Sequence, residues 1–258
     1  MHTLPSPAPE PPLPILFQDD SLVAIHKPSG LLVHRTVLDR HETRFAVQLL
    51  RDQIGRHVFP VHRLDRGTSG VLLFALDKDT ARLLTRQFEA QQVDKRYLAI
   101  VRGHPPEAGS IDHALSRERD DLEFQGEASS QAAQEARTDY RRLAVAEIPY
   151  AVDRYPSSRY ALVELTPHTG RRHQIRRHLK HIAHPIIGDS TFGKGRHNRL
   201  FQALYGSQRM LLACTRMALT HPHTGAPLVL EAPVDGDFVR VMDGLGWGAQ
   251  VATLQACR

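Results

Sequence analysis

The chain has 258 residues, of which 41% are hydrophobic and 24% are charged, a composition typical of a soluble globular protein rather than of a fibrous or fully disordered one. Its longest purely apolar stretch, residues 71–76, is far shorter than the roughly 20 residues that a membrane-spanning helix needs. The two cysteines give no disulfide framework and no cysteine-based zinc site, and the N-terminus has no secretory signal, so a cytoplasmic protein is expected.

The net charge of +5 is unevenly distributed along the chain. Residues 159–199 contain nine lysines and arginines and six histidines, but only two acidic residues. A phosphate-binding surface needs such a concentration of positive charge, so this segment indicates a polyanionic partner. Residues 116–139 carry seven acidic residues against three arginines, and they are predicted to form a loop or insertion rather than core.

The chain is expected to begin with a tail. Six of the first 14 residues are prolines, which predicts that residues 1–14 are extended and poorly ordered. Order is expected to begin at Ile15, with short strands at residues 15–17 and 22–26.

Three helices are predicted from periodicity and capping signals. One covers residues 42–54, where a glycine follows as a stop signal. A second is capped by Asp77 or Asp79 and runs to about residue 92. The third covers residues 173–183, because apolar side chains recur there at positions i, i+4 and i+7 while the basic ones point elsewhere.

Strands account for most of the remaining regular structure. Residues 71–76 are predicted to form a buried strand. In the next predicted strand, residues 95–101, the alternation places Lys95, Tyr97 and every second residue after them on one face. Further strands are expected at residues 138–146, 160–166, 211–220 and 227–230, with the turn between the last two at residues 221–225.

Strands therefore outnumber helices, and most of the connections between them are short. This pattern favours an α+β fold built on a mixed, mostly antiparallel β-sheet that is flanked by helices and loops. We expect a single domain over residues 15–258.

The block HRLDRGTSG, residues 62–70, sets Asp65 between two arginines. On this block alone, a carboxylate that caps its own turn explains Asp65 as well as a functional carboxylate does. Three further blocks follow in order, KRYLAIVRG, TPHTGRRHQIRRHL and HPIIGD, which begin at residues 95, 166 and 184. Together the four blocks resemble the RluA-type family of RNA pseudouridine synthases, and the resemblance extends over residues 15–235.

The resemblance implies a pseudouridine synthase fold with an active-site cleft across the sheet, no S4-like RNA-binding module, no metal and no cofactor. It implies that Asp65 is the catalytic nucleophile, that Arg176 keeps this carboxylate charged and that Tyr97 lies against the target base. Without the resemblance, Tyr97 is an ordinary half-buried strand tyrosine. Arg63 matches the residue that enters the space left by the flipped nucleotide, and the RNA-binding set as a whole is His62, Arg63, Arg171, His173 and Gln174.

Two other motifs are set aside. His178, His181 and His184 have no carboxylate or cysteine at a spacing that completes a metal site. GDSTFGKGR, residues 188–196, lacks the spacing of a phosphate-binding P-loop, and it is predicted to be a loop beside the site.

The resemblance leaves three functions open. The blocks LVHRTVLDR, RDQIGRHVFP and RYPSSRY, which begin at residues 32, 51 and 154, resemble the branch of the family that isomerises uridine 65 in the T-arm of certain tRNAs. The alternatives are a synthase that acts on ribosomal RNA or on both kinds of RNA, and an RNA-binding module without catalysis. A monomer is the default expectation.

Overall fold

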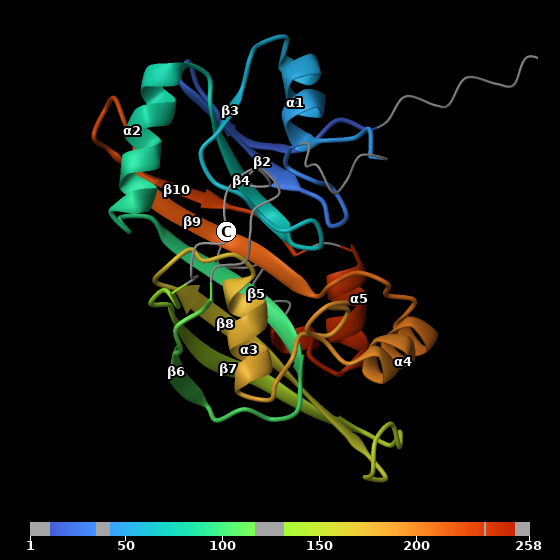
Figure 1. The fold of residues 1–258 in the computed structure, drawn as a ribbon. Coiled ribbons are helices and arrows are strands. Elements are labelled where there is room, and N and C mark those ends of the chain that lie inside the picture. The colour runs from blue at the N-terminus through green and yellow to red at the C-terminus, as the bar shows by residue number, and fades with distance from the viewer. Residues whose placement is uncertain (1–10, 35–41, 117–131, 235, 251–258) are drawn as a thin grey trace, which may run out of the picture.

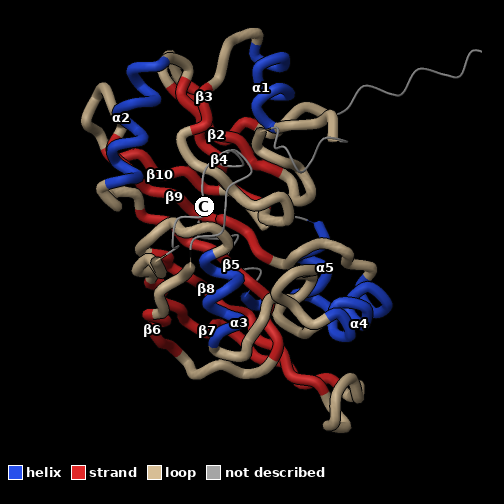
Figure 2. The backbone as a smooth tube through the Cα atoms, viewed as in Figure 1, coloured by secondary structure: helices blue, strands red, loops and turns tan. Residues whose placement is uncertain are grey.

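The computed structural model describes residues 11–34, 42–116, 132–234 and 236–250. Its described strands form one twisted sheet in the order β1-β2-β4-β9-β5-β8-β7-β6, with β3 beside β4 and β10 beside β9. The sheet runs through the middle of the molecule, and the helices lie outside it (Figures 1 and 2). The strands are β1 (Ile15–Gln18), β2 (Leu22–Lys27), β3 (Phe59–Pro60), β4 (Ser69–Ala75), β5 (Asp94–Arg102), β6 (Ala108–Asp112), β7 (Arg137–Ile148), β8 (Ser158–Pro167), β9 (Leu212–Thr220) and β10 (Pro227–Glu231).

The predicted α+β class is confirmed, because every named strand pairing is antiparallel except the one between β4 and β9. That parallel contact joins Ser69 to Ala213 and Gly70 to Cys214. Gly70 has φ +109, and a Cβ atom there would overlap the carbonyl oxygen of Cys214. Only glycine fits this position. The last residue of the Asp65 block therefore lies where β4 and β9 come together and the two halves of the sheet meet.

The alternation predicted for β5 is confirmed by its burial pattern. Tyr97, Ala99 and Val101 belong to the larger hydrophobic core on one face of the sheet. Leu98 and Ile100 belong to the smaller core on the other face. The two faces of this strand are therefore both covered, which explains why it is almost continuously apolar from residue 97 to residue 101.

Helices are distributed between the two faces. α1 (Ala46–Ile54), α2 (Lys78–Glu89) and α3 (Gln174–His181) contribute side chains to or against the larger core. α4 (Gly195–Tyr205) and α5 (Gly236–Gly244) pack against the smaller core. In Figure 1, α3 lies in front of β5 and β8, whereas α1 and α2 cover the half of the sheet that contains β2 and β4.

Several element boundaries differ from the sequence prediction. α1 begins at Ala46, four residues later than predicted, but it ends as expected at a glycine, Gly55, with φ 65. Asp77 is the residue that caps α2, because its side chain accepts a hydrogen bond from the Thr80 amide. The prediction missed β3, β6, α4 and α5. For α4 a signal was present, since the three ring-bearing residues His197, Phe201 and Tyr205 recur every four positions.

The tail prediction needs a correction at its C-terminal end. Leu13 is buried in the larger core, and its backbone N–H and C=O both bond to the side-chain amide of Gln53, at 2.8 and 2.9 Å. The carbonyl of Pro14 accepts a hydrogen bond from the His26 amide. Ordered structure therefore starts before Ile15, and residues 1–10 lie outside the described part of the chain.

The acidic segment was predicted to be a loop throughout, and most of it, residues 117–131, lies outside the described part of the chain. At its C-terminal end, Ala136 and Thr138 are buried, and β7 begins at Arg137. This end therefore belongs to the sheet rather than to a loop.

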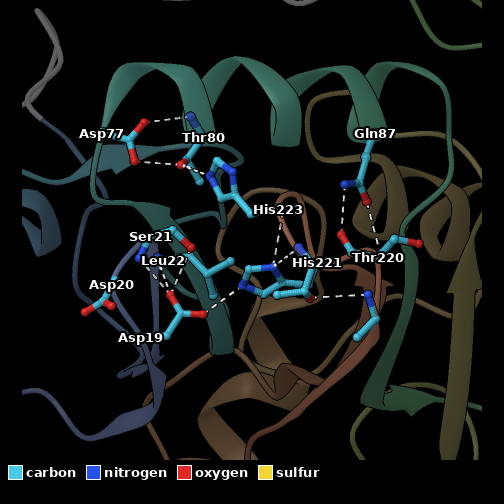
Figure 3. A network of polar contacts seen from close by, with 12 residues as sticks. Asp19, Asp20, Ser21, Leu22, Asp77, Thr80, Gln87, Thr220, His221 and His223 are labelled. Atoms are coloured by element: carbon cyan, nitrogen blue, oxygen red, sulfur yellow. Dashed lines mark hydrogen bonds and ion pairs between the residues drawn. The ribbon is translucent and has the colours of Figure 1, made fainter.

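A polar network ties together three segments that are distant in sequence (Figure 3). Asp19, in the turn between β1 and β2, accepts hydrogen bonds from the Ser21 and Leu22 amides and lies 2.7 Å from Nε2 of His221. Nδ1 of His221 accepts from the amides of the β9–β10 turn, so Nε2 carries the proton and donates it to Asp19. In the same turn, His223 Nε2 lies 2.7 Å from the Thr80 hydroxyl at the start of α2.

This network gives the fold a pH dependence that we can predict. Burial raises the pKa of Asp19, but hydrogen bonds from Ser21, Leu22 and His221 outweigh it and lower the value to about 2. A carboxyl group with a lowered pKa stabilises the fold above its unfolded-state pKa, and that stabilisation is lost as the pH falls toward the folded-state value. Asp19→Asn is therefore expected to be less stable than the wild type at pH 7, and urea unfolding should show the difference shrinking between about pH 4 and pH 2. A difference that stays constant over this range contradicts the prediction.

Candidate active site

The Asp65 block forms a turn that leads into β4. The Thr68 amide donates to the backbone carbonyl of Asp65 rather than to its carboxylate, so the side chain does not cap its own turn in the way considered above. The carboxylate instead faces α3, where Nη1 of Arg176 donates to Oδ2 at 3.0 Å. Nε2 of His173 lies 3.9 Å from Oδ1. The predicted pairing of Asp65 with Arg176 is therefore present in the structure.

Arg176 is itself held by a second carboxylate that sequence reasoning did not select. Nε and Nη2 of Arg176 donate to the two oxygens of Asp189 at 2.7 and 2.9 Å, a bidentate pair with planar geometry. Asp189 also accepts from the amides of Thr191 and Phe192, and the Phe192 ring covers the guanidinium at 4.9 Å. The only sequence signal for this role is that Asp189 ends the HPIIGD block.

The ionisation of this cluster follows from burial and pairing. Burial alone lowers the pKa of the Arg176 guanidinium, but the hydrogen bonds to Asp189 and the charges of Asp65 and Asp189 outweigh it and raise the value. Burial raises the pKa of Asp189, but the hydrogen bond and charge of Arg176 and the Phe192 amide lower it below its usual range. Both groups therefore stay charged at neutral pH, and a fixed positive charge faces the Asp65 carboxylate.

Lys27 also holds the turn that carries Asp65, and sequence reasoning did not select it. Its ammonium is fully buried and donates to the carbonyls of Pro28, Leu31 and Arg66 at 2.9, 2.7 and 3.2 Å. Burial lowers the pKa of Lys27 to about 7, although the nearby charge of Asp65 acts in the opposite direction. The three bonds attach the segment after β2 to the residue that follows Asp65, which fixes the position of the turn.

Tyr97 projects from β5 toward the same region and is 9% exposed. Burial, the Cys214 thiol and the charge of Asp65 raise the pKa of its phenol well above the ordinary value. The hydroxyl group therefore stays protonated at neutral pH. It can stack and donate a hydrogen bond, but it is not a resting-state proton acceptor.

Two cavities meet at Asp65. The smaller, of about 480 Å³, has apolar side chains such as Ile175 and Leu212 beside Tyr97, but most of its lining is polar or charged, including Asp65 and Lys95. The larger, of about 880 Å³, opens on the other side of Asp65 and carries most of its charge on arginines, namely Arg63, Arg66, Arg172, Arg176 and Arg209. Both cavities are rich in basic side chains, so either can accept phosphates, and the smaller one also offers the ring of Tyr97 to a planar base.

Three of the residues predicted to bind RNA lie where RNA can reach them. Arg63 is exposed and lines both cavities, as does His173, which has a left-handed φ of 55 at the start of α3. Arg171 lines the smaller cavity, and its Nε donates to the backbone carbonyl of Glu135. Whether these three bind RNA stays a prediction.

The other two residues predicted to bind RNA also line the smaller cavity, and their roles stay predictions, but their side chains already have structural bonds. Gln174 is buried, and its amide group donates to Arg137 and Thr138 and accepts from Thr169 and Arg171, which uses its full capacity. His62 stacks on Phe88 at 5.0 Å, and its Nε2 accepts a hydrogen bond from the Leu73 amide.

Burial lowers the pKa of His62 to about 3, so the ring is neutral at pH 7 and does not attract phosphate.

The described residues contain no group of three or more His, Cys, Asp or Glu side chains placed to hold a metal ion. Nor does any described helix combine the length and apolar character that crossing a membrane requires.

Comparison with known proteins assigns this arrangement to a family. The family model for RNA pseudouridylate synthases matches residues 21–181, more than half of the chain. The chain belongs to the RNA pseudouridylate synthase family. Within it, the chain is 51% identical to the tRNA pseudouridine synthase C of Pasteurella multocida, over 91% of this chain and 97% of that protein. It is 46% identical to the tRNA pseudouridine synthase C of Vibrio vulnificus, over 93% and 98% of the two chains.

Solved structures of human family members have the same fold. Human RNA pseudouridylate synthase domain containing 4 superposes with a TM-score of 0.65 at 30% identity, covering 90% of this chain and 93% of that one. Human RNA pseudouridylate synthase domain containing 1 gives a TM-score of 0.67 at 25% identity and covers 98% of both chains. The predicted pseudouridine synthase fold is therefore confirmed for this family member.

Proposed function

We propose that this synthase converts uridine to pseudouridine in transfer RNA, at uridine 65 of the T-arm, with Asp65 as its catalytic carboxylate. The observation that supports this best is the set Asp65–Arg176–Asp189, in which a buried ion pair holds the guanidinium against the Asp65 carboxylate in the cavity that Tyr97 also lines. The tRNA substrate is supported by the relatives that bear the name tRNA pseudouridine synthase C. We propose further that the protein acts as a monomer in the cytoplasm and needs neither metal nor cofactor.

The reaction has three steps, and the residues of the site serve the first two. The C1′–N1 bond breaks with its electron pair left on the base, and Asp65 attacks or stabilises the carbon centre that is left electron-poor. The freed base must turn without leaving, and the Tyr97 ring and the apolar side chains of Ile175 and Leu212 give it a surface on which to turn. C5 then bonds to C1′, the proton on C5 is lost, and N1 takes up a proton, so product and substrate are isomers.

Access to Asp65 requires that the nucleotide leave its helix. Flipping a base costs a few kcal/mol in lost stacking and pairing. Arg63, exposed between the two cavities, has a planar guanidinium that can stack in the vacated space and contact phosphate at once. Arg66 and Arg209 line the larger cavity, where they would hold the phosphates that flank the target.

The experiment that tests this function is a map of pseudouridine in total RNA from cells with and without the protein. We expect one site, position 65 of a set of tRNAs, to lose pseudouridine in the deletion strain and to regain it when the wild-type gene is restored. Loss confined to a ribosomal site rejects the tRNA substrate and supports the ribosomal alternative. Unchanged modification at every site rejects the enzymatic proposal as a whole.

A further inference from the structure

Lys95 lies in the smaller cavity, and the reaction as described does not use it. It is two residues before Tyr97 on the same face of β5, and it is half-buried. Its ammonium makes no hydrogen bond or ion pair with any other residue that the structure describes. The adjacent Asp94 instead pairs with Arg216 at 3.1 Å. The nitrogen of Lys95 is not among the fully buried atoms without a partner, so it still contacts solvent. A ligand that fills the cavity and displaces this water would have to supply an acceptor atom, because an ammonium without a partner is costly to remove from water.

The position of Lys95 within the cavity suggests which acceptor this is. The charge of Asp65 acts on Tyr97 but is not among the charges that act on Lys95, while Cys214, which is paired with Tyr97 across β5 and β9, acts on both. Residues two apart on a strand are separated by roughly 7 Å. A pyrimidine that lies on the Tyr97 ring with its sugar toward Asp65 therefore extends its far edge toward Lys95. In uracil that edge carries the carbonyl oxygens O2 and O4.

We propose that Lys95 donates a hydrogen bond to a carbonyl oxygen of the flipped uracil and holds the base while it turns. This inference rests on the proposed function and assigns a further catalytic residue within the same site. The ring of uracil has an approximate symmetry axis through N3 and C6. A half-turn about this axis exchanges N1 with C5, which the isomerisation requires, and it also exchanges C2=O with C4=O. The same ammonium thus meets a carbonyl oxygen before and after the turn.

The positive charge also acts on the chemical step. When the C1′–N1 bond breaks, its electron pair remains on the base, and the negative charge spreads onto O2 and O4. The C1′ carbon is meanwhile bonded to or stabilised by the Asp65 carboxylate, until C5 attacks it and the C5 proton is lost while N1 gains one. A donor placed in advance at a developing anion contributes about 100-fold to 1,000-fold to the rate of such steps. Cytosine carries an amino group in place of O4, which an ammonium repels, so Lys95 also favours uridine over cytidine.

The test compares Lys95→Met, which removes the donor and the charge, with Lys95→Arg, which retains both. Lys78→Met is the matched control, since Lys78 is exposed at the start of α2 and away from both cavities. The measurements are the single-turnover rate of pseudouridine formation on an unmodified tRNA transcript at saturating enzyme, the Kd for that transcript, and the thermal midpoint of each variant. Lys95→Gln, which keeps a neutral donor, replaces Lys95→Met if the latter does not fold.

We expect Lys95→Met to lower the single-turnover rate about 100-fold while the Kd changes less than about threefold. Lys95→Arg should recover most of the rate, and Lys78→Met should match the wild type. If the Kd rises and its salt dependence weakens by about one phosphate contact while the rate at saturation is unchanged, Lys95 binds the RNA backbone and the inference is overturned. A wild-type rate in Lys95→Met overturns it as well. A wild-type protein that forms no pseudouridine on tRNA instead rejects the proposed function itself, which keeps the two failures distinct.

Discussion

Asp65→Asn is expected to abolish pseudouridine formation, with a loss of about 10⁴-fold or more in the single-turnover rate. Asparagine has the same shape and still accepts a hydrogen bond from Arg176, but it has neither the negative charge nor the nucleophilic oxygen of the carboxylate. Affinity for tRNA should stay within about threefold of the wild type, because phosphate contacts dominate binding.

The control for this prediction is Asp20→Asn, an equally conservative change at an exposed carboxylate in the turn between β1 and β2. Rates should be taken from nucleoside analysis of the product, with affinity measured by filter binding on the same transcript. Measurable turnover in Asp65→Asn together with normal folding would show that another group supplies the nucleophile. An equal loss of affinity and rate would place Asp65 in binding rather than in chemistry.

Arg176→Met is expected to impair both stability and activity. The guanidinium makes three hydrogen bonds to two carboxylates, and the side chain of Asp189 is completely buried. Removing one partner of a buried ion pair leaves an uncompensated charge and costs about 3–5 kcal/mol of unfolding free energy. The ammonium of a lysine lacks the planar fork of the guanidinium, so Arg176→Lys should recover only part of either property.

A double variant separates the structural role of Arg176 from its chemical role. Combining Arg176→Met with Asp189→Asn removes both buried charges and keeps an oxygen that accepts from the Thr191 and Phe192 amides, so urea unfolding should show recovery of most of the lost stability. Activity should remain lost, because Asp65 still lacks its positive neighbour. If the double variant regains the wild-type rate, the guanidinium serves the fold alone.

Local patterns predicted much of the fold. Alternation placed Tyr97 and Lys95 on one face of β5, and Asp77 and Gly55 marked the ends of two helices, because strand period and helix capping depend on neighbouring residues. α4 was missed because its apolar residues pack against a core assembled from distant strands. Propensity within a short window does not report such contacts.

Less of the site than of the fold could be predicted from the sequence, because the polar contacts within the site join segments that are far apart along the chain. The sequence blocks selected Asp65, Tyr97 and Arg176, which line one cavity, and their catalytic roles stay predictions. The RNA-binding roles of His62 and Gln174 also stay predictions, but the sequence did not show that their polar atoms bond to the backbone and side chains of other elements. Lys27 and Asp189 were missed for the same reason. The contact of Lys27 with Arg66 spans 39 residues of the chain, and that of Asp189 with Arg176 spans 13.

The sequence by itself determined the class of fold, the family resemblance and the carboxylate at the centre of the site, since each depends on residue type and spacing along one segment. Only the tertiary structure decided which groups are charged and which are already bonded. Burial and pairing set the ionisation of Arg176 and Asp189, and the packing of β5 against β9 left the Lys95 ammonium beside Tyr97. The free energy of a charge depends on the solvent and partners around it, and these are fixed by contacts between segments far apart in sequence.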